Sequence, residues 1–223
     1  MKRQLEIRAA EGGEDSKLFV TDLARAYQRL AQRVGWTARL IDQRPGECSL
    51  LIQGTDLLGL DNEPGGHRIQ RVPPTERKGR VHTSTVTVAV LDPSIAQTAI
   101  QDRDLRVEWY SGTGAGGQYR NKHQNSCRIT HVPTGIQATA QCRSRENSYT
   151  EARAAIEQRV LGAHTAQVMG QRARDRRDQV GSGMRGDKRR TYRFQDDTVQ
   201  DHVTGAKSRA SAVMRGYFEA LWR

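Results

Sequence analysis

The sequence is poor in aromatic residues, in cysteine and in long apolar runs, and each shortage excludes a class of protein. Phe, Trp and Tyr make up 5% of the 223 residues, so we expect a modest core under a large polar surface. The three cysteines are odd in number and widely spaced, which argues against a disulfide framework and is typical of a reducing compartment. The amino-terminal MKRQLEIRAAEGG lacks an apolar signal region, and no run of about 20 apolar residues occurs. We therefore expect a soluble, cytoplasmic protein with no membrane partner.

Metal binding is the first alternative use of the cysteines. Cys127, His131 and Cys142 could contribute to a zinc site, but no fourth ligand stands at metal spacing. The sequence thus predicts neither a metal nor a cofactor.

Acidic residues are too few to balance the basic ones. Lys and Arg number 36 against 25 Asp and Glu, a formal net charge of +11. Such an excess favours a polyanionic partner, most often nucleic acid. The alternative is a merely solvated basic surface, but residues 141–190 hold twice as many basic as acidic side chains, which favours contact with RNA.

The hydrophobic pattern predicts an α+β protein in three parts. The first, 1–104, reads as an antiparallel sheet with one packed helix. Its strands are QLEIRA, WTARLID, CSLLIQG, HRIQRV and HTSTVTVAVL. Phe19, Leu23, Tyr27, Leu30 and Val34 recur at helical spacing, with Ser16 as the expected N-cap and Gly35 as the end.

The second part, 105–180, reads as a smaller α+β domain, and the third, 181–223, as a segment too short to be stable alone. LRVEWY is a strand, CRITHV and IQATAQC form a hairpin, and a long helix spans about 146–178. The inner face of that helix is expected to contain Ala152, Ile156, Val160 and Ala163. The third part is expected to pack on the first through RTYRF, TVQDHVTG and a terminal helix bearing Val213, Tyr217 and Leu221.

A glycine-rich stretch, YSGTGAGGQYRNKHQ at 110–124, follows the strand LRVEWY. Gly112, Gly114 and Gly117 match the dinucleotide-binding spacing, but QYRNKHQNS has no apolar stripe for a packed helix, and the first acid after Gly117 is Glu146. A Walker loop would need Lys after Gly117, where Gln118 stands. The alternatives left are an ordinary flexible loop, or a backbone device that aims an N–H group at a reacting atom in another molecule's active site.

The context of Gly-Gly-Gln favours the second alternative. SGTGAGGQYRNKHQNSCRITHVPTGI resembles the GGQ segment of class I peptide chain release factors. LEIRAAEGGEDSKLFVTDLARAY, GGHRIQRVPPTERKGRVHTSTVTVAVL and RGDKRRTYRFQDDTVQDHVTG resemble other segments of the same family, in the same order.

The resemblance implies hydrolysis of the peptidyl-tRNA ester in the ribosomal peptidyl transferase centre. Gly116, Gly117 and Gln118 would be the catalytic residues, with the Gln118 N–H stabilising developing charge and its side chain positioning water. Gln118 would also be a candidate for N5-methylation by a glutamine methyltransferase. Whether this makes the chain an enzyme is open, because rRNA would supply much of the active site.

The same resemblance implies contacts with RNA. Pro73, Thr75, His82 and Glu14 would lie at the codon or decoding centre, and the expected rRNA-binding residues are Arg120, Lys122, Arg172, Arg174, Arg176 and Arg177. The expected partners are the ribosome through rRNA of both subunits, peptidyl-tRNA and mRNA.

The sequence also departs from the family pattern. A full-length factor has a helical domain before LEIRA, and here the chain begins there. Arg77, Lys78 and Arg80 make the codon loop more basic than usual, which suits phosphate contact better than base discrimination. The chain most resembles the short release factor H group, linked to an RtcB-type RNA ligase. Rescue of stalled or decoding-centre-damaged ribosomes is therefore expected, with stop-codon-dependent termination of the UAA/UAG type as the alternative.

Overall fold

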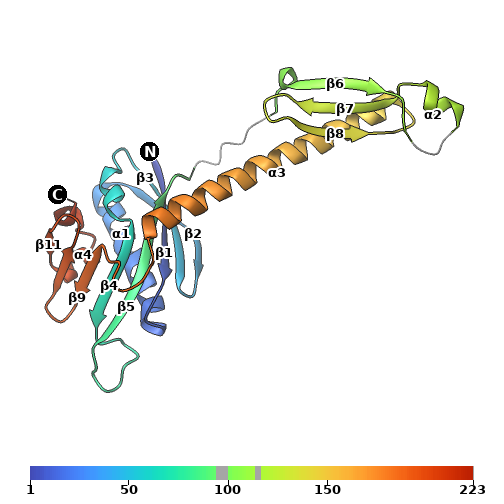
Figure 1. Ribbon diagram of the computed structural model, residues 1–223. Helices are drawn as coiled ribbons and strands as arrows, with labels where there is room; N and C mark the ends of the chain where they lie inside the picture. Colours follow the sequence, from blue (N-terminus) through green and yellow to red (C-terminus); the bar gives the residue numbers. More distant parts are fainter. Residues whose placement is uncertain (94–99, 114–116, 223) are drawn as a thin grey trace. The chain divides into compact units, whose positions relative to one another are not determined.

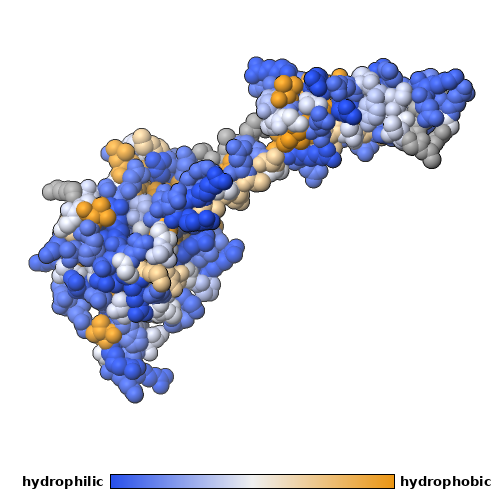
Figure 2. Space-filling view, viewed as in Figure 1, coloured by the Kyte–Doolittle hydropathy of each residue, from blue (hydrophilic) through white to orange (hydrophobic). Residues whose placement is uncertain are grey.

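The computed structural model describes residues 1–93, 100–113 and 117–222, with only the backbone of Tyr119 and Arg120 (Figure 1). The chain divides into two compact units, one of Met1–Ser94 with Arg172–Arg223 and one of Ile95–Gln171. These limits differ from the boundaries at 104 and 180 that the sequence suggested, because the end of the long helix packs on strands of the first unit. Hydrophilic residues cover most of the visible face of each unit (Figure 2).

The first unit is built on an eight-stranded sheet. Every neighbouring pair is antiparallel except β4 and β9, which run parallel. The strand order is β11 (Lys207–Ser208), β10 (Thr198–Asp201), β9 (Arg190–Arg193), β4 (Gly65–Arg71), β5 (His82–Leu91), β1 (Lys2–Ala9), β3 (Glu47–Gln53) and β2 (Thr37–Arg44).

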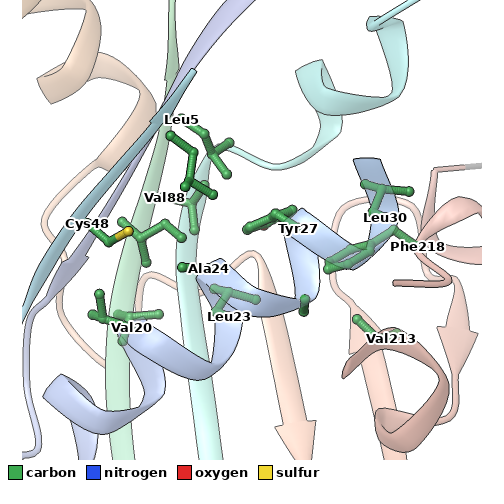
Figure 3. Close-up of a cluster of buried hydrophobic side chains, with 14 of the residues drawn as sticks. Leu5, Val20, Leu23, Ala24, Tyr27, Leu30, Cys48, Val88, Val213 and Phe218 are labelled. Atoms are coloured by element: carbon green, nitrogen blue, oxygen red, sulfur yellow. The ribbon is translucent and has the colours of Figure 1, made fainter. Parts of the chain in front are cut away.

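Helix α1 (Glu14–Val34) covers one face of this sheet. Its apolar residues Phe19, Leu23, Tyr27 and Leu30 are fully buried against inward-facing residues of the strands, such as Leu5 and Val88 (Figure 3), and Val34 is partly buried. The N-cap is Gly13 rather than Ser16, whose hydroxyl instead donates to the Gly13 carbonyl at 2.7 Å. Gly35 ends the helix in the left-handed conformation, as its position predicts.

The carboxyl-terminal segment packs on the first unit, as expected, but not through one terminal helix. Helix α4 (Ala210–Met214) stops at Gly216, whose φ is +96° and whose missing side chain leaves room for the backbone of Leu30. A 3₁₀ turn, η3 (Glu219–Leu221), follows. The break turns Tyr217 outward, where Arg33 stacks on its ring, and buries Phe218 against Tyr27 instead.

A buried ionic cluster fastens this segment to the rest of the unit. Arg190 is fully buried and donates to Glu63, which follows the 3₁₀ turn η1 (Leu58–Asn62), and to Asp201. Glu63 also accepts from the Tyr27 hydroxyl at 2.6 Å and from the Trp222 indole. Because every buried charge here has a partner, the cluster fixes the register of β9 beside β4.

The second unit consists of a three-stranded antiparallel sheet and most of one long helix. Strands β6 (Leu105–Tyr110), β7 (Ser126–His131) and β8 (Ile136–Ala140) lie in that order, after the 3₁₀ turn η2 (Asp102–Asp104). Helix α3 (Arg145–Val180) buries Ala152, Ile156 and Val160 against the sheet. Ala163, expected on the same face, is exposed.

The end of α3 packs within the first unit, on the sheet face opposite α1. The Arg176 guanidinium donates to both oxygens of buried Glu6, at 2.6 and 2.9 Å. The Gln179 side-chain amide both accepts from the Val90 N–H and donates to the Val90 carbonyl, at 2.8 Å each. Val90 lies beyond the last residue of β5 that pairs with β4, so Gln179 extends the hydrogen-bonding pattern of the strand.

Candidate functional site

The glycine-rich connection leads from β6 to a single helical turn, α2 (Gln118–Lys122). The sequence analysis found no apolar stripe for a packed helix after Gly117, and this turn is only five residues long. It has too few residues to pack across a sheet as the helix of a dinucleotide-binding fold does. Gly114 and Gly116 lie outside the described residues, as do the side chains of Tyr119 and Arg120.

Gly117 and Gln118 are both exposed. A Cβ atom at Gly117 would meet nothing within 4 Å, and its φ lies outside the left-handed region. Neither packing nor backbone strain therefore requires glycine at position 117. Lys122 is also exposed and belongs to the same turn.

A small cavity lies at the base of this connection. It measures about 340 Å³ and is lined by Gly112, His123, Asn125, Ser126, Gln141, Cys142 and Arg143. Hydrogen bonds across it tie the two ends of the connection to the β8–α3 junction, including Asn125 to the Arg143 carbonyl at 3.0 Å and Gln141 to the Tyr110 hydroxyl at 3.3 Å. The base of the connection is thus anchored while Gly117 and Gln118 face solvent.

Two of the three residues considered for zinc have other partners. The Cys142 thiol donates to Glu151 at 2.9 Å, and this hydrogen bond raises the pKa of the thiol. His131 Nδ1 contacts the Thr134 hydroxyl at 2.7 Å. Over the described residues, no group of three or more possible metal ligands occurs. Within those same ranges, no helix is both long and apolar enough to cross a membrane.

The predicted codon-contact residues gather at one end of the first unit. The loop between β4 and β5, at the lower end of Figure 1, holds Pro73 and Thr75, and His82 opens β5. Pro73 is buried, whereas Thr75 and His82 are exposed.

Glu14 lies on the same side of this unit because α1 begins there. Its neighbour Asp15 is buried and accepts from Arg71 and Ser84, each at 2.8 Å. These two partners belong to the strands on either side of the loop. Glu14 itself is exposed and pairs with Lys17 at 3.1 Å.

Glu76 organises the loop, and the sequence interpretation missed it. Its carboxylate accepts from the Lys78 backbone N–H at 2.7 Å, from Arg80 at 3.1 Å and from His82 at 2.7 Å. The backbone hydrogen bond from Lys78, together with His82 and Arg80, lowers the pKa of Glu76 to about 2. The sequence did contain a signal for this role, because Glu76 is the single acid among the basic residues of TERKGR.

The four basic residues predicted at the end of α3 divide into two pairs. Arg176 is held by Glu6, whose hydrogen bonds raise the Arg176 pKa, and Arg172 donates to the Asp92 carbonyl at 2.9 Å. Arg174 and Arg177 are exposed. The second pair therefore presents more accessible charge to a partner.

Comparisons with known proteins agree with this arrangement. Residues 2–88 match the PCRF domain and residues 93–203 match the RF-1 domain. Peptide chain release factor 1 of Nitrosomonas europaea is 42% identical over 208 residues, covering 89% of this chain and 58% of that protein. The factor of the same name from Variovorax paradoxus is 40% identical over 223 residues, covering 95% and 62%. This chain thus spans about three fifths of the length of these relatives.

A solved structure gives the same result. RF2 of Thermus thermophilus superimposes with a TM-score of 0.57 at 27% identity, over 99% of this chain and 66% of that one. The two matched domains, the relatives and the α+β architecture all agree. The chain belongs to the class I peptide chain release factor family.

Proposed function

We propose that this protein binds the ribosome and promotes hydrolysis of the peptidyl-tRNA ester through Gly116, Gly117 and Gln118. The observation that carries the proposal is the exposed Gly117–Gln118 pair, which nothing within the described chain requires. Residues without an internal role are available to a partner. Family membership makes the ribosome the partner to test first.

The chemistry follows from the position of Gln118 as the first residue of α2. An N–H group at a helix start has no acceptor within the helix, so the Gln118 N–H is available to a developing oxyanion. One such preorganised donor contributes about 10²- to 10³-fold in rate. The uncharged side chain both donates and accepts, which suits the positioning of water, and it is the proposed site of methylation by a glutamine methyltransferase.

The proposed RNA contacts are distributed over both units. Arg120, Lys122, Arg174 and Arg177 would bind rRNA phosphates, whereas Arg172 and Arg176 would first have to leave their internal partners. The loop with Pro73 and Thr75 would reach the decoding centre and mRNA. The proposed compartment is the cytoplasm.

Rescue of stalled or decoding-centre-damaged ribosomes is our preferred role, with a functional link to an RtcB-type RNA ligase. The loop supports it through charge. Arg77 and Lys78 are exposed, and among the described residues neither side chain pairs with a carboxylate. Free cations at a loop tip suit phosphate contact more than base recognition.

Stop-codon-dependent termination is the second candidate, favoured by the exposed Thr75 hydroxyl and the His82 ring. A codon reader needs both groups positioned. The hydrogen bond that the ring donates to Glu76 does this for His82.

Peptide release on purified ribosomes carrying labelled peptidyl-tRNA tests the activity. Gln118→Ala is expected to slow release while binding to the ribosome persists. The matched control is Gln158→Ala, at an exposed position of α3. Equal release by both variants and the native chain would refute the assignment.

The role is tested by changing the ribosome rather than the protein. Release is compared on UAA, UAG, UGA, sense and truncated messages, using intact ribosomes and ribosomes cleaved in the decoding centre. We expect the cleaved or truncated complexes to give the fastest release. Strong release confined to intact ribosomes with UAA or UAG would favour termination instead.

A further inference from the structure

A cluster of basic residues lies on the outer face of the first unit's sheet, opposite α1. Arg68 of β4 stands beside Thr85 of β5 and beside Thr191 of β9. Side chains alternate along a strand, and the next residues, Ile69 and Tyr192, are buried in the core under α1. Arg68, Thr85 and Thr191 therefore share the opposite face.

The next pair of residues along β4 and β9 adds a second cation. Gln70 stands beside Arg193 and beside Thr83. Arg193 is thus two residues from Thr191 on the same face, diagonal to Arg68. Arg68, Gln70 and Arg193 are all half-buried.

The segment before β9 crosses this face, and two more basic groups lie here, Lys188 in that segment and His202 directly after β10. The Arg189 N–H donates to the Gly66 carbonyl at 2.8 Å, and the Asp187 carbonyl occupies the space where a Gly66 side chain would be. The His202 N–H donates to the Arg189 carbonyl at 2.7 Å, and its ring contacts the Thr191 hydroxyl at 2.8 Å. Lys188 and His202 consequently lie near Arg68.

The charges in this cluster repel one another. Burial, and then the charge of Arg193, lower the pKa of Arg68. Burial lowers the pKa of His202 as well, followed by the charges of Lys188 and Arg68, while Asp201 opposes the shift.

The two carboxylates nearest to the cluster in the described chain accept hydrogen bonds from other groups. Asp201 accepts from Arg190 and from the N–H groups of Val203 and Thr204, and Asp187 accepts from Ser182. Within the described ranges, Arg68, Lys188 and Arg193 form no ion pair. A concentration of like charge without a counter-charge is what an anion site requires.

A second observation is independent of charge. Arg68 Nε and Thr85 Oγ1 are both buried, and neither has a hydrogen-bond partner among the described residues. Thr85 is fully buried, and the two residues are direct neighbours on β4 and β5. Buried polar atoms in native proteins normally have a partner, so two adjacent ones without any point to a ligand.

We propose that Arg68, Lys188 and Arg193, with His202 beside them, bind adjacent phosphate groups of an RNA backbone. Arginine binds phosphate through paired N–H groups. The outward-facing residues of β4, β5 and β9 include no aromatic residue on which a base could stack. The Thr83 hydroxyl and the Gln70 amide, both on half-buried residues, suit phosphate and ribose contacts, by which double-stranded RNA is largely recognised. The choice of RNA as the source of the phosphate rests on the proposed function.

The test measures the affinity of the full chain for an RNA hairpin over a range of salt concentrations. Each lost phosphate contact lowers the slope of log affinity against log salt by about 1. We expect a decrease of about 1 for Arg193→Gln and about 2 for Arg68→Gln/Arg193→Gln. Arg39→Gln, an exposed residue of β2, controls for net charge and is expected to leave the slope unchanged. Slopes equal to that of Arg39→Gln would overturn the site.

A second measurement identifies the source of the phosphate. The Nε–Hε signals of Arg68 and Arg193 are followed by NMR during titration with the hairpin and, separately, with inorganic phosphate at constant ionic strength. Shifts that saturate with RNA support the proposal, and shifts with inorganic phosphate alone overturn it. Arg193→Gln, at the end of a strand, keeps the test valid if the double variant fails to fold.

These measurements are separate from the test of peptide release. They use no ribosome and leave Gln118 intact. A native chain that binds the hairpin through this cluster but releases no peptide would contradict the proposed activity and support the site. The opposite pattern would contradict the site alone.

Discussion

The Arg190 cluster and the Gly117–Gln118 pair use polar residues in opposite ways. Around Arg190, each charged group is buried and hydrogen-bonded, and the bond to Glu63 joins residues 127 positions apart. At Gly117 and Gln118, the residues are exposed and nothing in the described chain constrains the choice of side chain. The first group serves the fold and the second is free to serve a partner, so changes in the two should affect different measurements.

The largest expected effect is on stability at the buried cluster. Glu63→Gln leaves Arg190 with a single carboxylate partner, and breaking a buried pair of this kind typically costs about 3–5 kcal/mol. Urea denaturation of the first unit is the measurement. Asp61→Asn, an exposed acid of η1 that pairs with Arg3, should change stability by less than about 1 kcal/mol. Similar losses in the two variants would remove the distinction between the regions.

Gly117→Ala should have the opposite effect: it should leave the stability of the fold almost unchanged and slow peptide release. Open space around Gly117 predicts a change in stability within about 0.5 kcal/mol, whereas peptide release should fall about 10²- to 10³-fold if the loop positions the Gln118 N–H. Melting temperature and release rate are measured on the same preparation. A destabilised variant would show that Gly117 has a structural role after all.

The stability of the first unit should depend on pH through a buried residue, His67. Burial, and then the Arg190 charge, lower the pKa of His67 to about 4 from 6.5. The unfolded chain therefore binds more protons between these values, so stability falls as pH falls from about 6.5 to 4, by about 3 kcal/mol. His67→Gln should flatten this dependence, and His164→Gln on α3 should not. Unfolding is followed by tryptophan fluorescence in a Trp109→Phe background, in which Trp36 and Trp222 report on the first unit.

The smallest effect should be the one that protonation of Glu76 has on the order of the loop between β4 and β5. This loop is exposed, and hydrogen bonds to the Glu76 side chain hold it together. With its pKa lowered to about 2, the Glu76 carboxylate stays charged well below the ordinary value. Its contribution to loop order is present above about pH 4.5 and lost as pH falls through about 2. The Lys78 amide shift should follow that midpoint and be constant in Glu76→Gln. A midpoint near 4.5 would mean that these hydrogen bonds do not persist in solution.

Local patterns predicted most of the elements of this fold. The spacing of Phe19, Leu23 and Tyr27 located α1, and the strand-like run HTSTVTVAVL located β5. They did not predict the parallel pairing of β4 with β9. That pairing joins His67 to Arg190, and it depends on contacts that no short window of sequence contains.

The same limit applies to the site. Gly-Gly-Gln and its context indicated where to look, because the signal lies within a few consecutive residues. The roles of Glu76 and Asp15 depend instead on which residues the fold brings beside them. Asp15 accepts from residues of two different strands, and Glu76 accepts from the loop and from the start of β5. The pairing of Arg176 with Glu6 likewise spans 170 positions and appears only once the helix end is placed.

Gln179 shows how narrowly one position in this chain can be specified. A primary amide carries one acceptor and one donor side, like the peptide group whose place it takes beside Val90. Deamidation would replace the nitrogen by oxygen and turn the bond to the Val90 carbonyl into a repulsion between two acceptors. The contact between α3 and β5 is therefore sensitive to the slow deamidation of a single side chain. That reaction changes one heavy atom and leaves the volume of the residue almost the same.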